Sequence, residues 1–127
     1  MYYAISLSPE TQAKLWRIYN TFFIELGKGW VKHMDHITLI HSSNPAWETT
    51  AKILSNFEHK ECSFKLIGIG YSDNAIAFRV NTQTANEVSH ITVAVKEEHK
   101  PVESNQITTW EKIYCNEELT GTITFNM

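Results

Sequence analysis

The chain has 127 residues, of which 43% are hydrophobic and 20% are charged, and 11 basic against 14 acidic side chains give a formal net charge of −3. This composition excludes an intrinsically disordered chain and predicts a single globular domain over residues 1–127, large enough to bury about two-thirds of its unfolded surface. The acidic excess argues against an extended nucleic-acid surface, since proteins that follow long nucleic acids usually carry a basic face.

The first third of the chain predicts a strand, a helix and a second strand. Apolar residues alternate with small or polar ones over residues 2–7, which indicates a half-buried strand. Ser8 and Pro9 suit the cap and first turn of a helix, and apolar residues at spacings of three and four continue it to about Gly27. Residues 30–41 are predicted to form the next strand.

The rest of the chain predicts one more helix and a series of strands. A second cap-and-proline pattern at residues 42–45 begins a helix that runs to about Glu58. A turn signal at residues 70–74 joins two strands as a hairpin. The expected strands cover residues 63–69, 75–81, 89–95, 107–114 and 119–125, with polar loops at 82–87 and 102–106. The total is about six strands, or seven with the short run at 107–114, and two helices, which predicts an α+β fold.

Two segments carry the same three residues inside a β-branched, apolar run. They are His36-Ile37-Thr38 and His90-Ile91-Thr92. Side chains two apart in a strand point to the same face, so each segment presents one imidazole beside one hydroxyl. In the second segment, Ile91, Val93 and Val95 are expected on the opposite face of the strand. One such pair is expected by chance in a chain with six histidines, whereas a second identical copy in a strand-like run favours a shared role.

Two imidazoles and two hydroxyls form the set that a metal-free phosphodiesterase requires. One imidazole takes a proton from the attacking oxygen, and the second gives a proton to the leaving oxygen. The hydroxyls hold the non-bridging phosphate oxygens. The sequence supplies this set in duplicate, and such a pair of imidazoles predicts a bell-shaped pH profile near the histidine reference pKa of about 6.5.

Two alternatives to an acid–base pair stay open. His33, His36 and His41 lie close together around Asp35, which suggests a metal site, but a regular strand would place His33 and His41 on the face opposite His36. A binding module that holds a nucleotide in the same cleft without cleaving it is the alternative outside catalysis. Neither histidine segment has zinc-like spacing, so we expect no metal and no cofactor.

The two cysteines and the N-terminal residues indicate the cellular compartment of the protein. Cys62 and Cys115 are isolated and are expected to be free thiols in a reducing compartment. The start of the chain lacks the basic region and the apolar length of a signal peptide, and the chain has no apolar run of about 18 residues. We therefore expect a cytoplasmic protein that does not enter a membrane.

The paired motifs resemble those of the 2H phosphoesterase superfamily. The run from His36 to Asn105, together with Trp110 and Gly121, looks most similar to the branch that contains the cyclic phosphodiesterase domain of fungal-type tRNA ligases and its small RNA-repair-like relatives. Short phage proteins that destroy cyclic oligonucleotide signals are also similar. The resemblance implies a compact bilobal fold of antiparallel sheets, with two main helices and a central cleft.

The resemblance also implies roles for the motif residues. His36 and His90 would be the catalytic acid–base pair, in either order, and Thr38 and Thr92 would bind the phosphate. The expected reaction is metal-independent cleavage of a cyclic nucleotide phosphodiester, either an RNA 2′,3′-cyclic phosphate end or a cyclic oligonucleotide. We expect a monomer whose partner is this small nucleotide or RNA end.

Four further residues are candidates for substrate binding. Arg79 is a lone cation between small residues on a predicted strand face, where it contacts either a phosphate or a neighbouring carboxylate. Tyr71 and Trp110 lie in or beside loops and are candidates for stacking on a base. Ser104 is a candidate only through the resemblance.

Overall fold

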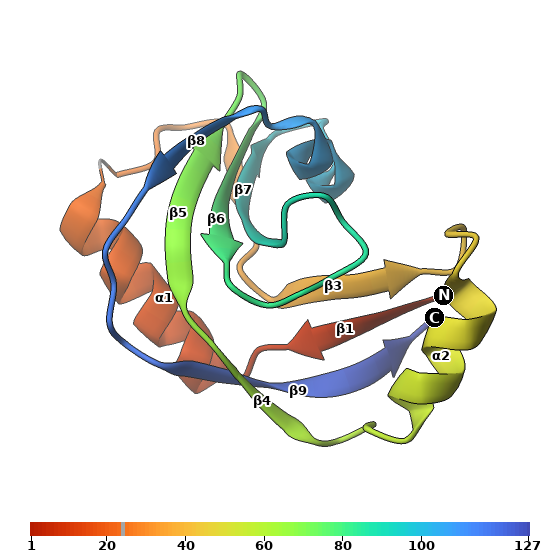
Figure 1. Ribbon diagram of the computed structural model, residues 1–127. Helices are drawn as coiled ribbons and strands as arrows, with labels where there is room; N and C mark the ends of the chain where they lie inside the picture. Colours follow the sequence, from red (N-terminus) through yellow and green to blue (C-terminus); the bar gives the residue numbers. More distant parts are fainter. Residues whose placement is uncertain (24) are drawn as a thin grey trace.

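Within the part of the chain that the structure describes, the protein folds around an antiparallel sheet of nine strands, accompanied by two α-helices and one 3₁₀ helix (Figure 1). The computed structural model describes residues 1–23 and 25–127. The predicted α+β class with antiparallel strands is confirmed. The helices are α1 Pro9–Phe22, α2 Trp47–Ser55 and the 3₁₀ helix η1 Pro101–Gln106, and the strands are β1 Tyr2–Ser6, β2 Trp30–Lys32, β3 His36–His41, β4 Glu61–Phe64, β5 Leu66–Tyr71, β6 Ala75–Val80, β7 His90–Lys96, β8 Thr109–Lys112 and β9 Leu119–Asn126.

The sheet consists of two groups of strands that meet at β3 and β7. Its order is β4-β9-β1-β3-β7-β6-β5-β8, with β2 pairing beside β7. β3 and β7 share a single register pair, Ile37 opposite Ile91. The two groups diverge from this contact, so that β1, β3 and β9 run in a different direction from β5, β6 and β7 (Figure 1). The strands that carry the two histidines are therefore neighbours that separate on leaving one shared point.

The prediction of one strand over residues 63–69 is wrong, because two strands occupy this segment. β4 pairs with β9 in one group, whereas β5 pairs with β6 and β8 in the other. The chain crosses between the groups at Lys65. Phe64 and Leu66 on either side are both buried, so the alternation of apolar and polar residues continues through the crossing without a signal.

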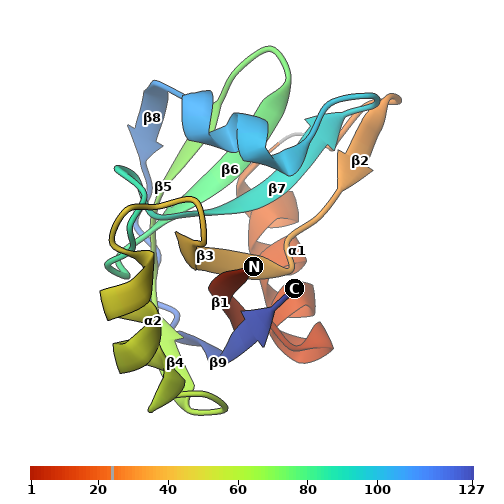
Figure 2. The same cartoon turned by 90° about the vertical axis from the view of Figure 1, so that its right-hand side faces the viewer.

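Both α-helices pack on the face of the sheet opposite to the two histidines. The ring of Tyr19 in α1 lies edge-on to Phe78 of β6 at 6.3 Å, and Trp47 of α2 lies 5.8 Å from Tyr3 of β1. Ile37 and Ile91 are fully buried on this face. Figure 2 shows α1 and α2 away from η1, which covers the other face. No helix among the described residues is long and apolar enough to cross a membrane.

α1 begins as predicted but ends earlier, whereas α2 begins later than the pattern at residues 42–45 predicts, at Trp47 with Ala46 as its N-cap. Ser8 Oγ accepts a hydrogen bond from the Thr11 N–H at 3.2 Å and so caps α1. The predicted continuation to Gly27 is wrong, because Phe23 already has extended backbone and residues 25–27 are not helical; residue 24 lies outside the described residues. Consecutive aromatic residues lose side-chain freedom in a helix, and Phe23 packs instead against Tyr19 and Phe78. α2 likewise ends before the predicted Glu58.

The predicted strand over residues 30–41 is interrupted at Met34. β2 pairs with β7, whereas β3 pairs with β1. Met34 between them has a φ of 75°, in the left-handed region that a non-glycine residue rarely adopts. Met34 is fully buried, and its N–H donates to the carbonyl oxygen of Thr92 at 2.8 Å. The backbone of the second motif thereby holds the turn that leads into the first.

Each histidine strand has a β-bulge directly after its threonine. In β3 the register passes from Thr38 to Ile40, so Leu39 is the extra residue. In β7 the register passes from Thr92 to Ala94, so Val93 is the extra residue. Bulges re-aim side chains and increase local twist, and they recur beside functional sites. The two copies of the motif therefore share their irregularity as well as their sequence.

These bulges correct two predictions that assumed regular strands. His41 lies on the same face as His36, because the bulge at Leu39 reverses the alternation of side chains. The ring of Tyr2 accordingly contacts both imidazoles. Val95 leaves the face of Ile91 and joins Ala75, Ala77 and Ile107 in a small apolar cluster. The predicted loop over residues 102–106 is the helix η1, which packs over this cluster.

Candidate functional site

The side chains of the two motifs meet in one pocket, called here the histidine pocket. His36 and Thr38 of β3 and His90 and Thr92 of β7 line a cavity of about 550 Å³. Other walls come from β1, the turn before α2, the loop before β7 and η1, and they include Tyr2, His41, Ser43, Asn86, Pro101 and Asn105. The four motif residues share one space because β3 and β7 are neighbours in the sheet.

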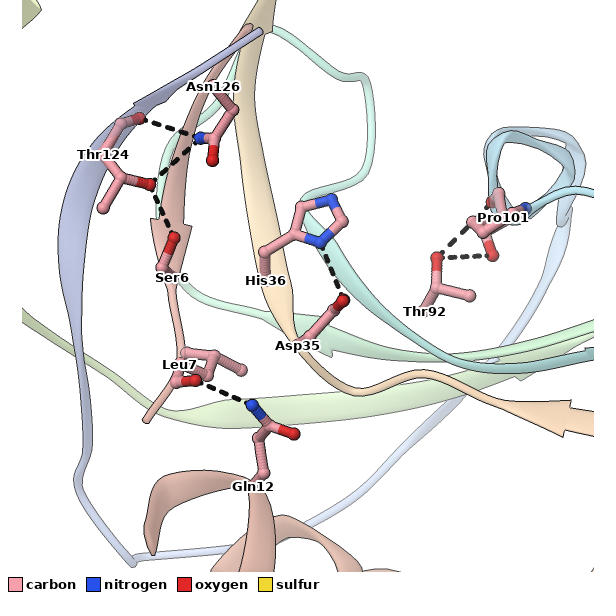
Figure 3. A network of polar contacts seen from close by, with 10 residues as sticks. Ser6, Leu7, Gln12, Asp35, His36, Thr92, Pro101, Thr124 and Asn126 are labelled. Carbon is pink, nitrogen blue, oxygen red and sulfur yellow. Dashed lines mark hydrogen bonds and ion pairs between the residues drawn. The ribbon is translucent and has the colours of Figure 1, made fainter. Parts of the chain in front are cut away.

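His36 is held by the carboxylate that precedes it. Its Nδ1–H donates to Asp35 Oδ1 at 2.8 Å (Figure 3). This hydrogen bond lowers the pKa of Asp35 below its ordinary value, so the carboxylate is charged near neutral pH. The side chain of His36 is 30% exposed and that of Asp35 is 59% exposed. With the proton fixed on Nδ1, Nε2 is the nitrogen available to a substrate.

The surface around His36 is polar and rich in hydroxyl groups. Ser6 of β1 lies opposite His36 in the register, and its hydroxyl is 2.6 Å from that of Thr124 in β9 (Figure 3). Asn126 donates to Thr124 from the same strand. The ring of Tyr2 lies 5.7 Å from the imidazole of His36 and is tilted by 43°. The first motif therefore stands on a polar, partly exposed part of the sheet.

His90 is held by a backbone carbonyl and is more deeply buried. Its Nδ1–H donates to the carbonyl oxygen of Val88 at 2.7 Å, which again leaves Nε2 for a substrate. Burial lowers the pKa of His90, the charge of His36 lowers it further, and the hydrogen bond to Val88 opposes both. The influence of His36 means that the two imidazoles lie within electrostatic reach of each other.

Thr92 is anchored to η1, whereas Thr38 is not. The hydroxyls of Thr92 and Ser104 are 2.9 Å apart, and the Thr92 hydroxyl lies 3.4 Å from the Pro101 carbonyl oxygen, a contact visible in Figure 3. Ser104 is only 1% exposed. Among the described residues Thr38 has no such anchor. Ser104, which the sequence marked only through a resemblance, therefore supports the hydroxyl of Thr92.

A second pocket adjoins the histidine pocket and is called here the Trp110 pocket. It has a volume of about 360 Å³ and shares His90, Asn86 and Asn105 with its neighbour. Trp110 forms one wall, with its ring centroid 6.4 Å from that of His90. The indole N–H donates to the Ile107 carbonyl oxygen at 3.2 Å. The structure thus brings Trp110 to the site.

The other two candidates from the sequence do not line either pocket. Arg79 lies opposite His90 in the register and is exposed, with its aliphatic stem over Gly68. Tyr71 is half exposed and lies with Phe22 and Ile69 on the helix side of the sheet. It follows Gly70, which faces Trp110, and alternation along β5 turns Tyr71 the other way.

Several residues that line the site were missed from the sequence, among them Tyr2, Asn86 and Asn105. Tyr2 lies on the polar face of β1, and its spacing from Ser6 was a usable signal once β1 was placed beside β3. Asn86 and Asn105 lie in or beside loops and carried no sequence signal. The positions of both amides depend on tertiary structure alone.

The described residues contain no group of three or more His, Cys, Asp or Glu side chains placed to hold a metal ion. His41 does reach the histidine pocket, contrary to expectation, but its Nδ1 accepts a hydrogen bond from the Ser43 N–H at 3.2 Å. His33 lies in the turn before β3. The cluster suggested by sequence proximity does not converge.

Comparison with known protein families gives a match over most of the chain. The model of a family described as the fungal tRNA ligase phosphodiesterase domain matches residues 6–126 of this chain. The match covers β3, β7 and η1, and hence both His-x-Thr motifs. No curated protein matches the chain.

Proposed function

Since this chain belongs to the family of fungal tRNA ligase phosphodiesterase domains, which are of the 2H phosphoesterase type, we propose that it cleaves a cyclic nucleotide phosphodiester by acid–base catalysis with His36 and His90. The substrate is an RNA end with a 2′,3′-cyclic phosphate or a cyclic oligonucleotide. In this proposal the two strand groups are the lobes of a bilobal fold, and the histidine pocket is its central cleft.

One observation carries the proposal: two His-x-Thr motifs, 54 residues apart in sequence, line the same pocket with matching bulges. A volume of about 550 Å³ lies within the range of small-molecule sites and suits a nucleotide. Each imidazole has its Nδ1 proton fixed by an oxygen acceptor, so each offers Nε2. This is the arrangement that two proton transfers at one phosphate require.

The surroundings of the two imidazoles support different roles. Burial favours the neutral form of His90, so His90 is the base that takes a proton from the attacking oxygen. His36 is then the acid that gives a proton to the leaving oxygen, with its ring oriented by the hydrogen bond from Nδ1–H to the Asp35 carboxylate. The attacking oxygen is water at a 2′,3′-cyclic phosphate and the ribose 2′-hydroxyl at a 3′,5′ linkage.

Thr38 and Thr92 bind the non-bridging phosphate oxygens in this mechanism. Their hydroxyls stand beside the imidazoles, two residues along each strand, where they donate to charge that grows in the transition state. Neither proton transfer nor phosphate binding calls for a metal, and we propose that turnover is metal-independent. The alternative of a binding module differs in one respect only, which is that it retains the substrate unchanged.

The test is a substrate panel with the purified chain in EDTA. It comprises nucleoside 2′,3′-cyclic phosphates, cyclic dinucleotides and an RNA with a 2′,3′-cyclic end, with products identified by phosphorus NMR. We expect turnover of at least one substrate, and its loss in His36→Ala. His59→Asn is the matched control, because His59 is exposed outside both pockets and asparagine tolerates its φ of 68°.

Three results would count against the proposal. Turnover that disappears in EDTA and returns with a divalent ion would assign the chemistry to a metal. Binding without turnover of any substrate would support the binding module. Full activity in His36→Ala would remove the acid–base pair from the reaction.

A further inference from the structure

The Trp110 pocket lies on one side of the histidine pocket only. The two pockets share His90, and the rest of the Trp110 pocket comes from the loop before β7, from η1 and from the start of β8. Its lining includes Val88, Gln106 and Thr108, but neither His36 nor Thr38. A substrate group that fills this space is therefore joined to the phosphate from the side of His90.

The wall formed by Trp110 is built to present an aromatic face. The indole N–H is already bonded to the Ile107 carbonyl oxygen, which fixes the ring. Opposite it in the register stands Gly70, where a Cβ atom would lie 2.5 Å from the ring of Trp110. A glycine is thus required for the ring to lie flat on the sheet. Such a ring stacks on any nucleobase, because every base has a π-face.

The polar groups of this pocket suit the edge of a base. Asn86, Asn105 and Gln106 line it, and each amide side chain carries both hydrogen-bond donors and acceptors. Glu87 adds an acceptor. A site with one aromatic wall and several amides matches a heterocycle with ring nitrogens and exocyclic groups. It does not match a second phosphate, for which cationic side chains would be expected.

We propose that the Trp110 pocket binds the base of the nucleoside whose 2′-hydroxyl attacks the phosphate. The inference rests on the proposed function, in which His90 takes the proton of the attacking oxygen. The 2′-oxygen forms a bond to phosphorus, the bond from phosphorus to the 5′-oxygen of the next nucleoside breaks, and His36 protonates that oxygen. The products are a 2′,3′-cyclic phosphate and a free 5′-hydroxyl.

This proposal selects a substrate class. At a terminal 2′,3′-cyclic phosphate the attacking oxygen belongs to water, so no nucleoside is needed on the side of His90. At a 3′,5′ internucleotide linkage the attacking ribose occupies that side, and its base reaches the Trp110 pocket. The substrate is therefore an internucleotide diester between ribonucleosides, as in a cyclic oligonucleotide.

The probes are adenylyl-3′,5′-adenosine, its analogue with a 2′-deoxy first sugar, and its analogue without the first base. We expect cleavage of the first compound and none of the deoxy analogue. Trp110→Ala should lower kcat/KM for the first compound by roughly 5- to 150-fold, the range of one base–aromatic stack, and should leave the abasic analogue unchanged. Trp110→Phe should keep most of the rate.

Two further variants separate stacking from stability. Gly70→Ala should reproduce the loss, because its Cβ displaces the ring while the indole stays in the chain. Tyr71→Ala removes a half-exposed aromatic from the opposite face of the same strand and should change nothing. Circular dichroism checks that each variant is folded. An equal loss on the abasic analogue, or no loss in Trp110→Ala, would overturn the assignment of the pocket to a base.

A comparison substrate keeps the two proposals distinguishable. If adenosine 2′,3′-cyclic phosphate is hydrolysed and the dinucleoside is not, the proposed function stands and this inference is wrong. If nothing is cleaved, the proposed function fails, and the pocket is tested by calorimetric binding of adenosine 3′-monophosphate and ribose 3-phosphate. Equal affinity of the wild type and Trp110→Ala for both ligands would then overturn the inference as well.

Discussion

β3 and β7 carry the same three residues and the same bulge, yet they place them in different surroundings. The imidazole of His36 is 30% exposed beside a charged carboxylate, whereas that of His90 is partly buried against a carbonyl oxygen. Thr92 is tied to a buried serine, and Thr38 has no comparable anchor among the described residues. The repeated sequence sets the geometry of the two halves, and the unequal packing around them sets their chemical difference.

That difference has a simple physical origin. A buried site away from counter-charge favours the neutral imidazole, and a neighbouring carboxylate favours the cation. Acid–base catalysis needs one imidazole of each kind at the same pH. η1 packs on β7 and β6, beside the second motif, so the surroundings of His90 differ from those of His36.

The largest expected effect comes from removing either imidazole. His36→Ala and His90→Ala should each lower kcat by on the order of 10²- to 10⁴-fold, because each deletes one proton transfer. The double variant should lose far less than the product of the two factors, since the residues act as a unit. Steady-state kinetics on the substrate found in the panel measures all three. Multiplicative losses would mean that the histidines act independently.

Substitutions of the two threonines test the difference between β3 and β7 with a smaller expected effect. Thr38→Val and Thr92→Val should each slow the reaction by about ten- to a few-hundred-fold, the effect of one hydrogen bond to a charged oxygen of roughly 1.5–3 kcal/mol. Only Thr92→Val should also lower the free energy of unfolding, because it breaks the contact with Ser104. Thr→Ser at each position is the control and should retain much of the rate. Unchanged rates in both valine variants would make the hydroxyls irrelevant to catalysis.

The sequence was a good guide to the faces of the strands near the motifs. His36 and Thr38, and likewise His90 and Thr92, share a face because two-residue periodicity holds within each short segment. The prediction of side-chain faces from the sequence is wrong from one residue later, at Leu39 and Val93, because a bulge depends on pairing with a distant strand. His41 was misplaced for this reason.

The pockets could not be predicted in the same way. Lys65 separates two strands that belong to different strand groups, and nothing in the local pattern of residues 61–71 marks the crossing. Trp110 was a candidate because it lies near loops, but its contact with His90 depends on the order of β7, β6, β5 and β8. Side chains that hold motif residues, such as Asp35 and Ser104, are identified by distance and burial.

A smaller effect is expected at the carboxylate of the first motif. Asp35→Asn keeps a hydrogen-bond acceptor for His36 Nδ1 but removes the charge. The imidazole of His36 then loses the charged acceptor that orients it, so kcat should fall. Because Asp35 is 59% exposed, we expect a loss of about tenfold or less near neutral pH. Steady-state kinetics measures this loss, and an unchanged kcat would mean that the Asp35 carboxylate does not position His36 for the reaction.

The smallest expected effect is on stability, and it isolates His90. Burial lowers the pKa of His90 in the folded state below the value of about 6.5 in the unfolded chain. Between these two values the unfolded state binds more protons, so the free energy of unfolding falls as the pH falls through this window and is constant, for this group, above it. Urea denaturation of the wild type and of His90→Asn should therefore show a difference in stability that changes between pH 7.5 and pH 5. A difference in stability that stays constant over this range would mean that burial does not lower the pKa of His90, and the assignment of His90 as the base would lose its support.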